Sequence, residues 1–269
     1  VYGFNRAATH GWGNSFTLTL FAISGLFLIG FVVIEKMVPN PLLPLRVVTE
    51  RNRGGSYLGS MVVGAGMFAM FLFLGLYLQV VLGYSPLRSG FAFLPFTAGI
   101  VLFAGIASQL MPKVGPKPLM IPGLIAAATG MILLTRLEPT SSYVSHVLPS
   151  LLIMSSGMAL CFIPLSTTSL HDVGAHDAGV ASAMMNTSQQ IGGSLGTALL
   201  NTVAATATSN FVSTHIAMGE AVKIYGMVHG FTVAFQVGAI LLLLGALILL
   251  AFINVGKDAV VEHEGVVLH

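Results

Sequence analysis

Charged side chains are scarce in this sequence, and their scarcity excludes most classes of soluble protein. Asp, Glu, Lys and Arg make up 7% of the 269 residues, whereas 55% are hydrophobic. Soluble domains carry about 25% charged residues, so the composition predicts an integral membrane protein. The net charge is only +2 and no basic run exists, so we expect no nucleic-acid partner.

Cysteine, and acidic residues within the apolar runs, are also nearly absent. Cys161 is the only cysteine, which excludes an intrachain disulfide. No Asp or Glu occurs in residues 54–112 or 139–169, and no P-loop is present. Ionisable residues inside the membrane are the usual sign of function there. Their absence argues against a membrane-embedded enzyme.

The segment HDVGAHD, residues 171–177, is the only place where histidines and aspartates gather. Its spacing matches no standard metal signature. We therefore predict no metal site and interpret Asp177 as the N-cap of the helix that follows.

Long hydrophobic runs are what the sequence has in abundance. A stretch of about 20 apolar residues is long enough to span a bilayer as a helix, and charges separate seven such stretches, at residues 16–34, 56–81, 90–111, 118–135, 147–169, 179–205 and 228–253. The predicted fold is thus all-α and membrane-spanning, with seven transmembrane helices. Val1 and the lack of a cleavage pattern near Arg6 favour a piece of a longer protein without a signal peptide.

The sixth stretch, GVASAMMNTSQQIGGSLGTALLNTVAA, differs from the others because it carries a polar stripe. It lies in a run without charge from residue 178 to 219. At 100° per residue, eight of its polar and small residues fall within one third of the helix circumference; they are Gly179, Ser182, Asn186, Gln189, Gln190, Gly193, Thr197 and Asn201. Unpaired amides are costly in hydrocarbon, so this stripe is predicted to face protein or water.

The loops between the stretches predict an orientation. Lys and Arg number seven on one side and four on the other, and the richer side is expected to be cytoplasmic. This places the C-terminus inside the cell.

An internal repeat is faintly visible. Gly66-Met67-x-x-x-Phe71 in the second stretch recurs as Gly157-Met158-x-x-x-Phe162 in the fifth. Such a short match arises either by chance or from the inverted three-helix repeats that are common in transporters.

Three segments together resemble the major facilitator superfamily, specifically the fourteen-span drug:proton antiporters of the EmrB/QacA type. They are PNPLLPLRVVTERNR, YLQVVLGYSPLRSGFAFLP and GVASAMMNTSQQIGGSLGTALL, in that order. The resemblance implies one extra central helix with its loops in residues 1–55, the six-helix C-terminal bundle in 56–253 and a cytoplasmic tail in 254–269. It implies the bacterial cytoplasmic membrane as location, and an N-terminal six-helix bundle as the missing partner.

The resemblance also implies a function: secondary active export of small amphipathic compounds by alternating access, driven by a proton gradient and without a cofactor. The family's proton-coupling carboxylate belongs to the N-terminal bundle and has no counterpart here. Two alternatives remain open from the residues. One is a truncated membrane subunit without transport of its own, and the other is a membrane-embedded enzyme.

Candidate site residues follow from the stripe and from the cavity-facing helices that the resemblance implies. Candidates for substrate contact or cavity lining are Asn186, Gln189, Gln190, Tyr77, Gln79, Met67, Phe71, Met158 and Phe162. Amides on one helix equally well bond to neighbouring helices, and a tyrosine at a span end equally well anchors the helix at the interface. Gly192, Gly193 and Gly196 suit close helix packing. Pro95 and Pro164 interrupt helices and are hinge candidates.

Overall fold

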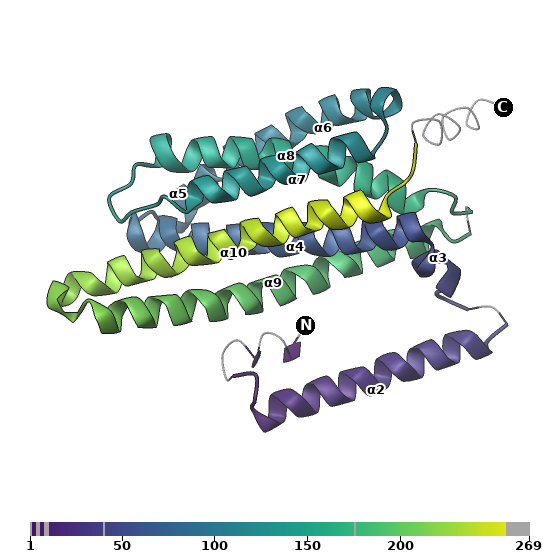
Figure 1. Cartoon of the computed structure of the whole chain (residues 1–269), viewed down its shortest axis with the longest axis horizontal. Coiled ribbons are helices and arrows are strands. Elements are labelled where there is room, and N and C mark those ends of the chain that lie inside the picture. Colours follow the sequence, from purple (N-terminus) through teal and green to yellow (C-terminus); the bar gives the residue numbers. More distant parts are fainter. Residues whose placement is uncertain (1, 4–5, 8–10, 40, 175, 257–269) are drawn as a thin grey trace.

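Every regular element is a helix in the computed structural model, which describes residues 2–3, 6–7, 11–39, 41–174 and 176–256 (Figure 1). The long helices are α2 (Ser15–Met37), α4 (Arg51–Leu76), α6 (Leu94–Val114), α7 (Lys117–Leu134), α8 (Leu148–Leu170), α9 (Ala178–Thr214) and α10 (Val222–Phe252). Two short helices, α3 (Leu45–Thr49) and α5 (Pro86–Ala92), precede α4 and α6. In lipid the backbone N–H and C=O groups of an apolar run must hydrogen-bond to one another, and a helix makes these bonds within itself. The predicted all-α class is confirmed.

Six helical stretches within the described residues are long and apolar enough to cross a membrane. They are Ser15–Met37, Arg51–Val81, Pro86–Val114, Lys117–Leu134, Tyr143–Leu170 and Met218–Phe252, and they overlap six of the seven predicted spans. The remaining prediction, residues 179–205, lies within α9, which is helical over 37 residues. Its amides, hydroxyls and glycines reduce its hydropathy, and it is not among the six. The count of seven spans is therefore not confirmed.

The helices from α4 onward form one bundle of two layers. In one layer α9 packs on α4, α4 on α8, and α8 on α6. In the other layer α10 packs on α9, α4 and α7, and α7 packs on α8. Figure 1 shows α10 crossing in front of α4 and α7 in front of α8. The core between the layers is made of large apolar side chains such as Phe73, Met131, Leu151 and Phe235.

Helix α2 lies apart from this bundle (Figure 1). Only 6% of its most apolar window is buried, so its side chains are left for lipid or another protein segment. After α2 the backbone N–H of Leu43 donates to the Glu35 carboxylate at 3.0 Å. The bundle itself begins with α4 at Arg51, and the predicted tail lies outside the described residues from position 257 onward.

Candidate functional site

The contact between α4 and α9 is close enough to bring backbone against backbone. A Cβ atom on Gly192 would collide with the backbone of Met61, and one on Gly196 would lie 2.5 Å from the side chain of Ala65. On the facing helix, a Cβ on Gly64 would meet the carbonyl oxygen of Gln189. Small residues are what allow membrane helices to approach this closely. The seam between α4 and α9 is thus fixed by glycines on both helices.

The amides of the polar stripe on α9 differ in exposure at this seam. Asn186 and Gln190 are exposed on the outer side of the helix, whereas Gln189 points into the seam and is half-buried. The side-chain nitrogen of Gln189 is buried without a hydrogen-bond partner. The exposed pair therefore presents two amides to whatever covers this face of the bundle.

Large apolar side chains of α4 lie beside the amides. Phe68 is 47% exposed, and its ring lies over Gly193, which leaves no room for a Cβ there. Phe71, one turn further on, packs against Phe93 and Phe96 with ring centroids 5.1 and 5.4 Å apart. These contacts make α4 a continuous apolar wall from α9 to the helix α6.

The remaining large side chains of the two repeat motifs, on α4 and α8, differ in exposure. Met67 is partly buried on α4, and its counterpart Met158 is only 2% exposed on α8. Phe162 is 39% exposed. Phe68, Phe162 and the two amides are therefore exposed, whereas Met158 belongs to the core.

Tyr77 and Gln79 lie at the far end of α4, in a π-helical turn (Tyr77–Val81). The Tyr77 side chain is fully buried, and its hydroxyl donates to the carbonyl oxygen of Glu138 at 2.8 Å. Gln79 is exposed. The structure thus places Tyr77 against the loop between α7 and α8 and not with the amides of α9.

The two candidate hinge prolines occupy different positions. Pro95 lies in the first turn of α6, directly after the break between α5 and α6 at Phe93. Pro164 lies inside α8 and is buried, and the Thr168 hydroxyl donates to its carbonyl oxygen at 2.7 Å. An interior proline removes one backbone hydrogen bond, so Pro164 weakens α8 locally.

The glycines of the two repeat motifs make equivalent contacts. A Cβ on Gly66 of α4 would meet Leu242 of α10, and one on Gly157 of α8 would meet Gly123 and Ala127 of α7. Likewise the pair α4–α9 corresponds to the pair α8–α6, where Gly99 faces Ser155. If α4, α6 and α7 form one repeat and α8, α9 and α10 the other, each of these contacts has its counterpart in the other repeat, as two inverted three-helix repeats would produce.

A group of arginines at the start of α4 was not singled out from the sequence. Arg53 is buried, and its guanidinium donates to four carbonyl oxygens: Val47 and Arg46 on α3 and His171 and Asp172 after α8, at 3.0, 3.0, 3.0 and 3.3 Å. It thereby joins the start of α4 to the neighbouring helix α3 and to the end of α8, which is 118 positions away in sequence. The sequence signal for this group is the run of three arginines within eight residues in the segment PNPLLPLRVVTERNR.

The acids near these arginines are held in their charged forms. Burial raises the pKa of Glu50, but the backbone N–H groups of Asn52 and Arg53 outweigh it, and the pKa lies below its usual value. Glu50 is the N-cap of α4 through those same two bonds. The pKa of Asp177 is lowered by its contact with His176 and by the charge of Arg46.

The residues of the HDVGAHD segment lie between α8 and α9 in the chain, where each can be compared with its prediction. Asp177 occupies the N-cap position of α9, but its carboxylate makes no capping bond and instead accepts from Arg46 at 2.7 Å. His171 and Asp172 pair with one another at 3.1 Å. Among the described residues no three metal-binding side chains come together.

The comparison with known families agrees with this architecture. The family model described as Major Facilitator Superfamily matches residues 7–197, and the chain belongs to this superfamily of transporters. It is therefore a multi-pass membrane protein of a transporter family and not a member of an enzyme family, and its bacterial relatives indicate a cell membrane.

Several curated relatives are named for drug or antibiotic export. The puromycin resistance protein pur8 of Streptomyces alboniger is 43% identical over 247 residues, which cover 90% of this chain and 49% of that protein. The cephamycin export protein CmcT of Amycolatopsis lactamdurans is 35% identical over 77% of this chain and 43% of its own. The multidrug resistance protein Stp of Mycobacterium tuberculosis is 28% identical over 80% and 40%. The chain spans about half, or less, of the length of these relatives.

Proposed function

We propose that this chain forms the C-terminal half of a secondary transporter that exports amphipathic drugs or other small molecules by alternating access. The observation that carries the proposal is the layer α9–α4–α8–α6, in which Asn186 and Gln190 of α9, Phe68 of α4 and Phe162 of α8 are all exposed, with the Phe68 ring against Gly193 of α9. Amides orient a ligand, and large aromatic side chains accept varied apolar shapes. A partner six-helix bundle would cover this surface and complete the cavity.

In this proposal α9 also spans the membrane, in addition to the six apolar candidates. Its 37 residues extend about 55 Å at 1.5 Å per residue, which exceeds the hydrocarbon thickness. It packs along α4 and α10, which are both among the apolar candidates. A polar stripe on such a helix is supported by water or by a facing protein surface.

Proton coupling is part of the proposal, and its chemistry belongs to the partner bundle. Residues 54–112 and 139–169 contain no Asp or Glu that could carry a proton through the membrane. We also propose that the C-terminus is cytoplasmic, because the loops on its side hold seven of the eleven Lys and Arg residues.

Export is tested in a sensitive bacterial host that expresses the whole protein containing this chain. Because pur8 is named for puromycin resistance, puromycin is the first compound to test, followed by a cationic dye. The expected results are resistance and an energy-dependent fall in dye accumulation that a protonophore abolishes. Unchanged accumulation of every compound tested, at verified membrane expression, would overturn the proposal.

The alternative of a subunit without transport of its own is tested through the native size. An antibody raised against KDAVVEHEGVVLH should detect a membrane protein of about twice the 28.1 kDa of this chain. A native mass near 28 kDa would favour the subunit. The remaining alternative, a membrane-embedded enzyme, has no supporting cluster among the described residues.

A further inference from the structure

A second face of α9, on the side opposite the amides, borders an apolar groove. Its residues recur at positions 184, 188, 191, 195 and 199, a spacing that places them on one side of a helix. Asn186 and Gln190 fall on the other side of α9, so the groove is separate from the surface proposed for transport. The facing wall is α4, and Trp12 of the segment before α2 and Leu241 of α10 complete the lining of the second part of the groove.

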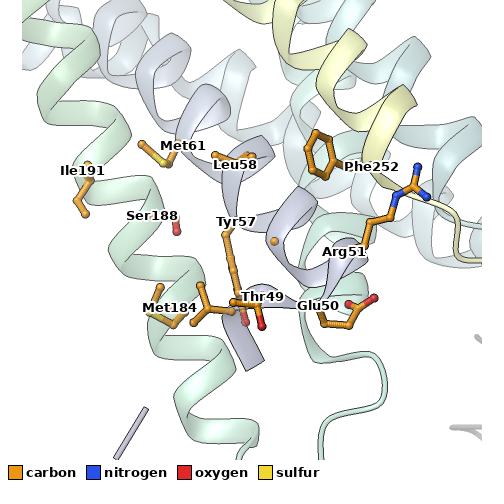
Figure 2. Close-up of a pocket in the computed structure, with 12 residues that line it drawn as sticks. Thr49, Glu50, Arg51, Tyr57, Leu58, Met61, Met184, Ser188, Ile191 and Phe252 are labelled. Carbon is orange, nitrogen blue, oxygen red and sulfur yellow. The ribbon is translucent and has the colours of Figure 1, made fainter. Parts of the chain in front are cut away.

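The groove consists of two neighbouring pockets that share Met61. The first, of about 430 Å³, lies at the start of α4 and is closed by Phe252 of α10 (Figure 2). The second, of about 300 Å³, continues along Ala65, Leu195 and Leu199. Nearly all of this lining is hydrocarbon, and α4 is among the helices apolar enough to cross a membrane. The groove thus has the length and chemistry to hold an alkyl chain.

Polar groups occur at one end only. Tyr57 is 4% exposed and lines the first pocket, and its hydroxyl is buried without a hydrogen-bond partner. Figure 2 shows its side chain extending toward Thr49 and Met184. A buried hydroxyl without a partner costs free energy, so a ligand that supplies an acceptor here would be stabilised.

Arg51 and Glu50 both line this end of the groove. Arg51 is exposed, and one of its nitrogens donates to the carbonyl oxygen of Ala251 at 2.6 Å; a guanidinium carries five N–H donors in all. Glu50, the acid beside it, already accepts from Asn52 and Arg53 with both carboxylate oxygens. The rim thus holds one charge of each sign, but only the Arg51 guanidinium keeps hydrogen-bonding groups for a ligand, and these donate to an anion.

We propose that this groove, called here the Tyr57 groove and lined by Tyr57, Leu58, Met61, Ser188 and Ile191, binds an anionic phospholipid. One acyl chain lies along α4 and α9, the ester or phosphate oxygens accept from the Tyr57 hydroxyl, and the phosphate lies beside Arg51. A ligand with an anionic head and a long alkyl chain matches the two ends of the groove, and the surrounding bilayer supplies it at high concentration. The site is independent of the proposed export activity.

The experiment is native mass spectrometry of the purified whole protein with phosphatidylglycerol and with phosphatidylcholine of identical acyl chains. One basic residue near an anionic lipid changes affinity by about fivefold, so phosphatidylglycerol should bind about fivefold more tightly. Arg51→Gln should remove this preference, whereas Arg136→Gln, a matched change of another exposed arginine, should retain it. Equal binding of both lipids by the unaltered protein would overturn the proposal.

Two further variants test the groove itself and not the charge. Tyr57→Phe removes only an oxygen that has no partner, so the fold is retained, and affinity for phosphatidylglycerol should fall about threefold. Ile191→Trp should block the groove and lower the binding of both lipids, whereas Leu247→Trp, on an exposed position of α10 outside the groove, should not. Unchanged lipid binding by Ile191→Trp would show that the groove is occupied by protein, such as the segment around Trp12, and would overturn the proposal.

Discussion

Arg46 and Asp177 are 131 positions apart in sequence, yet the guanidinium of one donates to the carboxylate of the other at 2.7 Å. The pair joins the short helix α3 to the first turn of α9. Arg53 adds a second connection, from α4 to the carbonyl oxygens that follow α8. The loops at this end of the bundle are therefore held together by charge-assisted hydrogen bonds, which are stronger than neutral ones.

Neutralising Asp177 should loosen this end of the bundle without unfolding it. In Asp177→Asn the pair with Arg46 is lost, and amide exchange should speed up in α3 and at the start of α9, with little change in α7. The exchanged pair Arg46→Asp with Asp177→Arg should recover part of the protection. Equal exchange rates in Asp177→Asn and the unaltered protein would show that the pair does not hold α3 in place.

The same carboxylate should make the connection sensitive to acid. The pKa of Asp177 lies below its ordinary value of about 3.9, so the pair stabilises the folded state fully above that value. The stabilisation is lost as the pH falls through the lower folded value. Protection of α3 should thus be constant between pH 5 and 8 and decrease below about pH 4, and Asp177→Asn should remove this decrease.

Gly192 should tolerate no side chain. An alanine Cβ would collide with the Met61 backbone, and overpacking of this kind costs about 1–3 kcal/mol. Gly192→Ala should lower the melting temperature of the purified whole protein. Gly105→Ala is the control, because Gly105 lies inside α6 with nothing within 4 Å; it should be neutral or stabilising. A melting temperature unchanged by Gly192→Ala would mean that α4 and α9 separate easily.

Tyr77 should act through structure and not through substrate contact. Its hydroxyl is buried and donates to Glu138, and losing one such bond costs about 1 kcal/mol. Tyr77→Phe should therefore lower thermal stability while leaving the relative resistance to different drugs unchanged. A changed order of drug preference in Tyr77→Phe, at equal expression, would place the hydroxyl in the substrate path.

Much of the fold could be predicted from the sequence because membrane helices are encoded by local properties. Length and apolarity located six spans, and the helical period located the polar stripe of α9. The helical period could not predict which neighbouring helix each face of α9 contacts. Whether Gln189 points into a seam while Asn186 stays exposed depends on the angle between α4 and α9. The hydrogen bond of Tyr77 depends on a loop 61 residues away.

The exposed amides of α9 provide the most direct test of the transport surface. Asn186→Leu retains the branched shape of the side chain and Gln190→Leu retains its helix propensity, and both remove its hydrogen-bonding groups. A hydrogen bond to a substrate contributes about 0.5–1 kcal/mol, so resistance to at least one exported drug should change about twofold to fivefold. The control is Gln236→Leu, an exposed amide on α10 in the other layer of the bundle, which should leave resistance unchanged. If Asn186→Leu and Gln190→Leu both transport several drugs at the normal rate and equal expression, these amides contact the partner bundle or water and not the substrate.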